Sequence, residues 1–411
     1  MIAKPEQFFV SHPTGNTFVR ALLSELDQQN RLKKYFTTIG TSQESRLISK
    51  LWGKRRNYSL NSNKLSTQFF PEILRLLPLG GKSQQSRRNA VDKSYQSLDN
   101  RVSKSLPMLK GDFIHAYEDG ALHSFSRAKE MGIFCSYELP IAHWQTVRQL
   151  LAEEVARFPE WEPTLESTRE PEEKLVRKDK ELSLADCITC PSNFVLQSIP
   201  SNIRESIPCQ ISLFGSPSYK EDTSTKNASG KNGKLKLLFV GSMSQRKGLA
   251  DLFEAMKLIN SKNVSLSILG SASMPMHFYR SHYPDFQYLH PRSNKGVREV
   301  MLEHDALVLP SIIEGRALVQ QEALACGLPL IVTQNAGGED LIEEGRTGFI
   351  VPIRKPDKIA EKIDWFGRNL KKLDEMSDFC RNKASQYKWS DYARSIINSC
   401  LRNRSNSTGI Q

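Results

Sequence analysis

Residues 311–329 read SIIEGRALVQQEALACGLP, and they directly follow the apolar run ALVLP. The run predicts a short strand that ends at its proline. The segment 318–326 predicts a helix, because a glycine and a proline just beyond it are ordinary signals for a helix end. The stretch therefore predicts a strand, a loop and a helix in succession, which is the repeating unit of an α/β fold.

Two glutamates of this stretch are separated by seven residues. Glu314 falls in the predicted loop, and Glu322 falls within the predicted helix, on the face of Leu318 and Val319. A carboxylate on an apolar helix face is costly unless hydrogen-bond donors reach it, and the paired hydroxyls of a sugar or a ribose are such donors. The spacing alone fits equally well a Glu322 side chain that extends into solvent.

Strand and helix patterns alternate on both sides of this stretch, in two series. The first series gives a domain at 1–215, within which residues 41–107 are polar, basic and difficult to assign. The segment 216–233 has almost no apolar residues and predicts a linker. The second series spans 234–387, and more helix follows it. Such alternation predicts a parallel, doubly wound sheet in each domain.

The composition is that of a soluble globular protein, with 411 residues, 39% hydrophobic and 25% charged. No apolar run approaches the ~18 residues that a membrane span needs. A strand pattern directly after the first residues argues against a signal peptide. Seven scattered cysteines fit a reducing compartment. Cys187 and Cys190 form the only close pair, and without a second pair for a zinc site we expect buried thiols in a cytoplasmic protein.

The net charge of +12 has a definite location in the chain. Residues 1–110 contain 19 Lys and Arg against 7 Asp and Glu, so the rest of the chain is neutral. The basic residues include Lys54-Arg55-Arg56, and apolar stretches interleave with them. Such a mixture suits an anionic membrane surface or a polyanionic acceptor, and nucleic acid is a further alternative. A solvated basic face without a specific partner explains the same charge.

The stretch 311–329 resembles the E-x7-E motif of the retaining glycosyltransferases of family 4, and its last eight residues, EALACGLP, fit that family as well. The resemblance implies that Glu314 lies beside the donor sugar and that Glu322 binds the ribose of the nucleotide. The sequence departs from the family at Arg316-Ala317, where many members carry Phe-Gly. Further donor contacts are implied between the two glutamates, at Gly315, Arg316, Ala317 and Leu318.

The segment GSMSQRKG at 241–248 closes the first strand pattern of the second series and opens a helix. Ligands of α/β sheets bind at the carboxyl ends of strands, and Arg246 and Lys247 are cations suited to a pyrophosphate. A surface turn with two exposed cations fits the segment equally well. In this loop the sequence is similar to family 4, which implies that Gly241 lies by the donor and that the two cations neutralise its diphosphate. Many members carry the arginine where this chain has Ser242.

Two residues of the first half also resemble family positions. Gly15, in the loop HPTGNT after the first strand pattern, resembles a glycine whose backbone faces the interdomain cleft. His143 resembles the family's cleft histidine beside the donor sugar, with a catalytic role next to Glu314. Without the resemblance, the loop at Gly15 fits a plain helix cap and His143 fits a structural histidine.

The resemblance covers the second half from about Leu235 to Tyr392 and the first half more loosely. It implies a GT-B fold, with two Rossmann-like domains facing a central cleft and the helix 388–411 packing back on the first domain. It implies transfer of a hexosyl group from a nucleotide-sugar donor to a saccharide or lipid-linked acceptor, with retention, in polysaccharide or glycoconjugate synthesis. The pattern implies no metal and no separate cofactor.

Alternatives from other classes stay open at this point. One is another Rossmann-type nucleotide-sugar enzyme, although neither domain has a G-x-G-x-x-G segment after its first strand pattern. Another is a non-catalytic protein that binds an anionic polymer or a membrane surface through residues 1–110. For the enzyme itself we expect no nucleic-acid partner. We expect either a purely cytoplasmic protein or one in peripheral contact with the anionic inner face of the membrane.

Overall fold

The structure is a computed structural model that describes residues 5–45, 57–69, 72, 84–165, 170–219 and 233–409. The basic segment Lys54-Arg55-Arg56 lies outside the described residues, as does most of the predicted linker 216–233. Among the helices of the described part, none combines the length and the apolar character that crossing a bilayer requires.

The N-terminal domain is built on a parallel sheet, in the order β3-β2-β1-β4-β5-β6-β7 within the described residues. Its central strands β1, β4, β5 and β6 are buried along their whole length, because helices cover both faces of the sheet. The strands are β1 Phe8–Ser11, β2 Leu32–Thr37, β3 Leu65–Thr67, β4 Phe113–Tyr117, β5 Phe134–Glu138, β6 Cys187–Cys190 and β7 Cys209–Ile211. The helices are α1 Thr17–Gln28, α4 Gln84–Ser105, α5 Leu122–Glu130, α6 Trp144–Arg157, α7 Glu172–Ser183, α8 Asn193–Ser198 and α9 Ser201–Ser206. Short 3-10 helices are η1 Gln43–Ser45, η3 Ser62–Lys64, η4 Leu106–Met108 and η5 Pro159–Thr164.

The C-terminal domain has its own parallel sheet, in the order β10-β9-β8-β11-β12-β13 within the described residues. The strands are β8 Leu235–Val240, β9 Val264–Leu269, β10 Phe286–Leu289, β11 Ala306–Leu309, β12 Leu330–Thr333 and β13 Gly348–Val351. The helices are α10 Leu249–Ile259, α11 Met276–His282, α12 Asn294–Leu302, α13 Leu318–Ala325, α14 Pro356–Arg368, α15 Lys372–Ser385 and α16 Trp389–Thr408. Short 3-10 helices are η7 Gln245–Lys247, η8 Gln334–Ala336 and η9 Glu339–Leu341.

Both sheets change direction of strand order at their first strand, β1 in one domain and β8 in the other. At such a switch point the loops after neighbouring strands separate and leave room for a ligand at the carboxyl edge. The prediction of two doubly wound parallel sheets is therefore confirmed. Cys187 and Cys190 are buried in β6, as expected for structural thiols.

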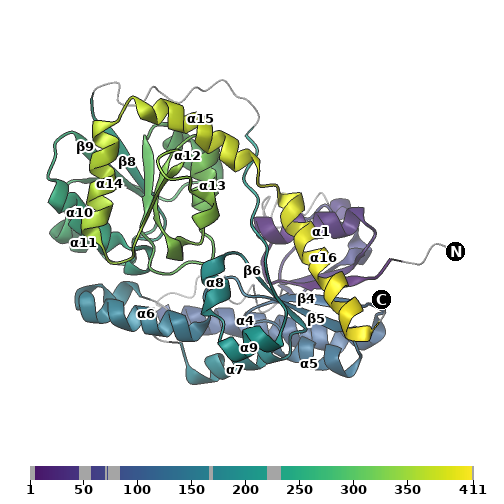
Figure 1. The fold of residues 1–411 in the computed structure, drawn as a ribbon. Helices are drawn as coiled ribbons and strands as arrows, with labels where there is room; N and C mark the ends of the chain where they lie inside the picture. Colours follow the sequence, from purple (N-terminus) through teal and green to yellow (C-terminus); the bar gives the residue numbers. More distant parts are fainter. Residues whose placement is uncertain are drawn as a thin grey trace.

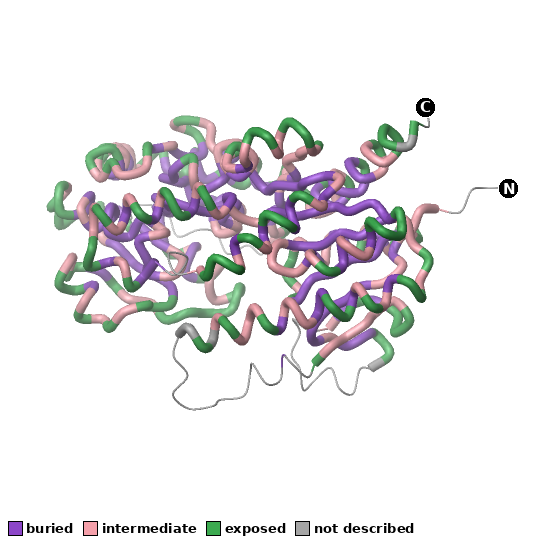
Figure 2. The backbone as a smooth tube through the Cα atoms, turned by 90° about the horizontal axis from the view of Figure 1, so that it is seen from below, coloured by how far each residue is buried: buried purple, intermediate pink, exposed green. Residues whose placement is uncertain are grey.

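The last helix connects the two domains. Figure 1 shows α16 leaving the C-terminal domain and lying along α1 of the N-terminal domain. Its apolar face, including Tyr392, Ile396 and Cys400, packs into the same core as the strands β1 and β4. Buried segments run through the middle of both domains, while exposed positions lie mainly on the outer helices (Figure 2).

One segment of the N-terminal domain is buried in the C-terminal one. Helix α6 extends beneath the C-terminal domain (Figure 1), and the 3-10 helix η5 follows it. The fully buried Trp161 of η5 belongs to the core of the C-terminal domain, where its ring contacts Phe253 and Phe278. The sequence boundary at 215 therefore does not separate the two cores, because Trp161 precedes that boundary and is packed in the C-terminal core.

Candidate active site

The loop after β8 is held tightly against the end of β11. Gly248 closes it with φ 72°, a left-handed conformation that favours glycine. A Cβ at Gly248 would also overlap the Pro310 carbonyl oxygen. On the other side, the Ile312 amide donates to the Arg246 carbonyl at 2.9 Å. The loops after β8 and β11 are thus joined into one surface at the carboxyl edge of the sheet.

Three charged side chains meet on this surface. Arg246 Nη1 donates to Glu314 Oε1 at 2.9 Å and to the Ile313 carbonyl at 3.0 Å. Lys247 Nζ forms an ion pair with the same Glu314 oxygen, and its aliphatic chain passes over Gly241. Glu314 is only 8% exposed. The sequence-predicted residues Arg246, Lys247, Glu314 and Gly241 are therefore brought together in space.

The electrostatics of this cluster suit an anionic ligand. Burial lowers the pKa of Lys247, and the neighbouring Glu314 carboxylate opposes that effect. One carboxylate faces two cations, so the cluster carries a net positive charge. A diphosphate could replace the carboxylate as the partner of both cations, because Arg and Lys both form strong, charge-assisted hydrogen bonds to phosphate.

The next residue, Gly315, lies directly against the N-terminal domain. A Cβ at this position would overlap the Pro140 carbonyl oxygen, so only glycine fits. Ser192 Oγ donates to the Gly315 carbonyl at 2.6 Å from the N-terminal side. The Glu314 loop is therefore placed at the interface of the two domains.

Glu322 lies inside α13 and is half-buried. Burial raises its pKa, and within the described part of the chain no hydrogen bond or ion pair to its carboxylate is present. Tyr219 and Cys326 are close enough for the charge of Glu322 to affect the pKa of both groups. A half-buried carboxylate of this kind is suited to bind the hydroxyls of a ligand. Its contact with a ribose stays a prediction.

The Arg316 side chain is held by residues of its own domain. Its guanidinium forms a bidentate ion pair with Asp340, at 2.6 and 2.9 Å, and also donates to the Gly337 carbonyl at 3.2 Å. The side chain is fully buried in the C-terminal domain. These partners fix the side chain within the loop, and a donor contact by Arg316 stays a prediction.

The two residues after it form the start of α13. The Ala317 amide donates to the Ala336 carbonyl at 3.2 Å, and Leu318 packs against the core that α16 shares with the N-terminal domain. Both positions lie between Glu314 and Glu322 in the sequence. A donor contact by either of them stays a prediction.

His143 is the N-cap of α6 and faces Asp179 on α7. Its Nδ1 accepts from the Gln145 amide, and Nε2 lies 3.2 Å from Asp179 Oδ1. Burial lowers the pKa of His143, so the neutral form is favoured. The pocket that His143 lines, of about 440 Å³, is formed by described residues of the N-terminal domain alone. The structure therefore does not show His143 beside Glu314, and its contact with a donor sugar stays a prediction.

Gly15 lies in the loop after β1, beneath Tyr58. A Cβ at this position would overlap the Tyr58 hydroxyl, and the Gly15 carbonyl accepts from Arg20 Nε at 2.9 Å. Close packing against Tyr58 is therefore one physical reason for a glycine here. A role in facing the donor stays a prediction.

Several polar residues around the Arg246–Lys247 loop are not predicted by the sequence patterns. Gln245 is part of the 241–248 segment, but only the two cations of that segment indicate chemistry. Glu154 and Arg354 are distant in sequence from this loop and contact each other at 2.5 Å. A single sequence gives no signal for such a long-range pair.

Part of the chain is similar in sequence to known proteins. Residues 221–383 match the family model of glycosyl transferases group 1. Spore coat protein SA of Bacillus subtilis is 28% identical over 194 residues, which cover 43% of this chain and 51% of that protein. The capsular polysaccharide biosynthesis glycosyltransferase CapM of Staphylococcus aureus is 32% identical over 139 residues, 31% of this chain and 35% of that one. The matches thus span about half the length of these relatives or less.

Solved structures resemble the whole chain. Sucrose-phosphate synthase from Thermosynechococcus elongatus has a TM-score of 0.70 at 15% identity, covering 98% of this chain and 100% of that one. HepE from Anabaena, solved in complex with UDP and glucose, has a TM-score of 0.61 at 13% identity, covering 97% and 100%. At these identities the likeness establishes the fold. The chain therefore has the two-domain GT-B fold of these structures, and its residues 221–383 are similar to the glycosyl transferases group 1.

Proposed function

We propose that this chain transfers a hexosyl group from a nucleotide-sugar donor to a saccharide or lipid-linked acceptor, with retention of the anomeric configuration, in polysaccharide or glycoconjugate synthesis. The observation that carries the proposal is the cluster of Arg246, Lys247 and Glu314 at the interface of two Rossmann-like domains. The relatives named for capsular polysaccharide synthesis support the pathway class.

In the proposed reaction, Arg246 and Lys247 bind the diphosphate of the donor. As the bond between the anomeric carbon and the leaving oxygen breaks, negative charge develops on that diphosphate. Two cations already in place stabilise this charge without further rearrangement, which lowers the barrier. Because these side chains supply the positive charge, we also propose that the reaction needs no resident metal ion.

The two glutamates have separate roles in the proposal. Glu314 would exchange its contacts with the cations for the hydroxyls of the donor sugar once the diphosphate arrives. Glu322, half-buried in α13, would accept hydrogen bonds from the ribose hydroxyls. The N-terminal domain would bind the acceptor and exclude water. This domain contacts Gly315 through Pro140 and Ser192.

A thermal-shift panel with UDP, GDP and ADP, followed by turnover assays with the matching nucleotide-sugars, tests the proposal. Binding of one diphosphate should raise the melting temperature in a concentration-dependent way. Turnover should persist in excess EDTA. A protein that none of the three nucleotides stabilises, and that binds a polyanion in a salt-sensitive way instead, would favour the non-catalytic alternative.

A further inference from the structure

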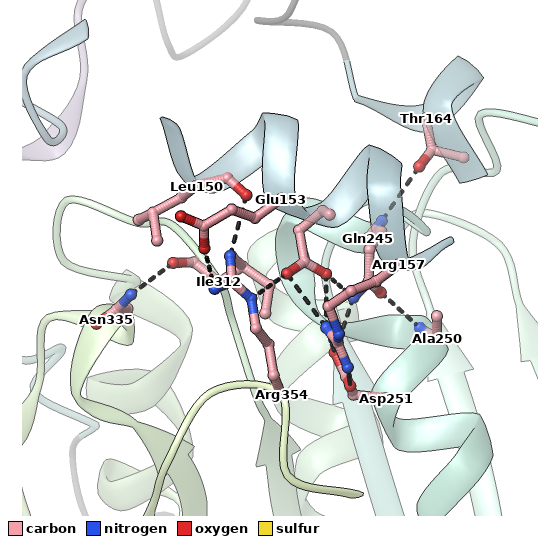
Figure 3. Close-up of polar contacts among 11 residues, drawn as sticks. Leu150, Glu153, Arg157, Thr164, Gln245, Ala250, Asp251, Ile312, Asn335 and Arg354 are labelled. Atoms are coloured by element: carbon pink, nitrogen blue, oxygen red, sulfur yellow. Dashed lines mark hydrogen bonds and ion pairs between the residues drawn. The ribbon is translucent and has the colours of Figure 1, made fainter. Parts of the chain in front are cut away.

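A buried polar network joins helix α6 of the N-terminal domain to the C-terminal domain (Figure 3). Its centre is the carboxylate of Glu154, which is 0% exposed. Three side chains donate to this carboxylate: Gln245 Nε2 at 2.6 Å, Arg354 Nε at 2.5 Å and Arg157 Nη1 at 3.0 Å. A buried charge is tolerated only when its hydrogen-bonding capacity is filled, and these donors fill it.

Gln245 links the network to the diphosphate loop. Its Nε2 also donates to Asp251 Oδ2 at 2.7 Å, and its Oε1 accepts from the Ala250 amide at 2.9 Å. Its own amide donates to Thr164 Oγ1 at 3.1 Å. Both side-chain polar atoms and the backbone amide of Gln245 are therefore fixed. Arg246 and Lys247 follow directly in the same short helix, so fixing Gln245 sets where that helix begins.

Arg354, which follows β13, binds helix α6 and is a second link between that helix and the C-terminal domain. It has φ 61°, a left-handed conformation that is unfavourable for a residue with a side chain. Its guanidinium donates to the Leu150 carbonyl at 3.1 Å and pairs with Glu153 and Glu154. These contacts span more than one turn of α6. The local backbone conformation is thus kept in place by an interaction between the two domains.

Apolar contacts complete the attachment of residues 144–164, which we call the interdomain bracket. Val147 and Leu151 of the bracket share a buried cluster with Ile312 and Ile313, which directly precede Glu314. Trp161, at the other end, is packed inside the C-terminal core. The bracket therefore contacts both loops that carry the charges of the candidate active site, one through polar groups and one through apolar groups.

We infer that Glu154 is a positioning residue for the donor diphosphate, and that the interdomain bracket couples the placement of the N-terminal domain to the geometry of Arg246 and Lys247. Glu154 itself touches no substrate. It acts through Gln245, whose position orients the short helix that presents the two cations. The inference rests on the proposed function, because it concerns the same diphosphate site.

The variant Glu154→Gln tests this inference. An amide keeps the shape of the side chain but removes the charge that two arginines and Gln245 share. The measurement is the ratio of dissociation constants for UMP and UDP by calorimetry, with GMP and GDP or AMP and ADP if the thermal-shift panel selects that base. We expect the preference for the diphosphate to fall about tenfold or more, since small displacements of binding groups are costly. The KM for the donor should rise more than kcat falls.

Glu153→Gln is the matched control. Glu153 is the neighbouring residue on α6 and also pairs with Arg354, but no contact joins it to Gln245 in the described structure. We expect this variant to keep the preference for the diphosphate within about twofold, because a partly exposed pair contributes little. A purely structural role of Glu154 would lower the melting temperature and leave the ratio of the two dissociation constants unchanged, and that result would overturn the inference.

A second variant covers the case in which Glu154→Gln does not fold. Thr164→Val keeps the size of the side chain and removes the acceptor for the Gln245 amide. It should also reduce the preference for the diphosphate, and an unchanged preference would again overturn the inference. A wild-type protein that binds no nucleoside diphosphate would overturn the proposed function and the inference together. If the wild-type protein binds a nucleoside diphosphate and the variants keep the wild-type preference for the diphosphate over the monophosphate, the inference alone is overturned.

Discussion

Replacing Glu314 with Gln should tighten the binding of a nucleoside diphosphate while it impairs turnover. In the structure both Arg246 and Lys247 are paired with the Glu314 carboxylate. An incoming diphosphate must compete with that carboxylate and then remain near it. Removing the negative charge should therefore release both cations for the ligand, whereas the loss of the proposed contact with the donor sugar should lower kcat.

The expected size of the effect follows from the contact geometry. A phosphate oxygen bound to Lys247 would lie within two hydrogen-bond lengths of the carboxylate, about 5.5 Å. At an effective dielectric constant of about 20, two unit charges at that distance repel by about 3 kcal/mol. Solvent and salt reduce this repulsion, so we expect a 10- to 100-fold lower dissociation constant, which corresponds to about 1.4 to 2.8 kcal/mol.

The pH of the measurement matters for this variant. Glu314 raises the pKa of Lys247 against the effect of burial, so its removal should lower that pKa further. Lys247 would then lose its proton at a lower pH than in the wild type, and the gain in affinity would shrink as pH rises. Calorimetry near pH 6.5 and at low ionic strength therefore favours the charged form of Lys247 in both proteins.

The control for net charge is Glu254→Gln, an exposed residue of α10 that pairs with Lys257. It changes the total charge by the same amount at a distance from the loop, so its effect on diphosphate affinity should be small. Unchanged or weaker binding in Glu314→Gln, with the control at wild-type affinity, would refute the view that Glu314 holds the cations before the donor binds.

Three further changes test other parts of the site. Glu322→Ala should lower kcat/KM by at least about 100-fold with an unchanged circular-dichroism spectrum, because the ribose loses its acceptor; normal activity would contradict this role. Lys247→Arg should reduce the loss of diphosphate affinity at alkaline pH, because burial lowers the pKa of Lys247 whereas arginine stays charged. Calorimetric titrations from pH 7 to 10 measure this loss, and an identical loss in both proteins would argue against lysine as the titrating group. Trp161→Ala should cost about 3–5 kcal/mol of stability, since the ring is fully buried in the C-terminal core; urea unfolding measures this, Trp161→Phe should cost less, and a change under 1 kcal/mol would contradict the packing.

The C-terminal domain could be predicted from sequence in detail. The segment 318–326 predicted a helix, and α13 spans Leu318–Ala325. The strands are short and mostly apolar, and glycines follow several of them, so strand and helix patterns are easily separated. Residues that follow parallel strands gather at one edge of the sheet, and together with the resemblance to family 4 this predicts one site for Arg246, Lys247 and Glu314.

Residues 41–107 were harder for a physical reason. They include α4, a polar helix of 22 residues whose apolar face is small. Only a few of its side chains, such as Leu98 and Val102, enter the core. Its Asp99 instead accepts from the amides of His123 and Ser124 at the start of α5. A helix held by such long-range capping has little hydrophobic periodicity, so sequence patterns cannot locate it.

The partners of charged residues could not be predicted either. Arg316 meets Asp340 and His143 meets Asp179, and in each pair the two residues are far apart in sequence. The segment after α6 has the same difficulty, because nothing in the pattern around Trp161 tells which of two cores will bury it. A hydrophobic pattern predicts that a residue is buried, but it does not predict in which domain. Trp161 precedes the C-terminal domain in sequence and is nevertheless buried in its core.

Ser242 illustrates what the three-dimensional arrangement adds to a motif. The resemblance to family 4 expects an arginine there, yet Ser242 has a neutral hydroxyl that lies 3.3 Å from that of Ser244. The 3-10 turn of η7 instead carries Arg246 to the same carboxylate that Lys247 reaches. A ligand is sensitive to where a cation lies in space and not to its place along the loop. Moving the cation into η7 therefore keeps two positive charges at the site, and it makes their position depend on Gln245 and on the helix of the other domain that holds it.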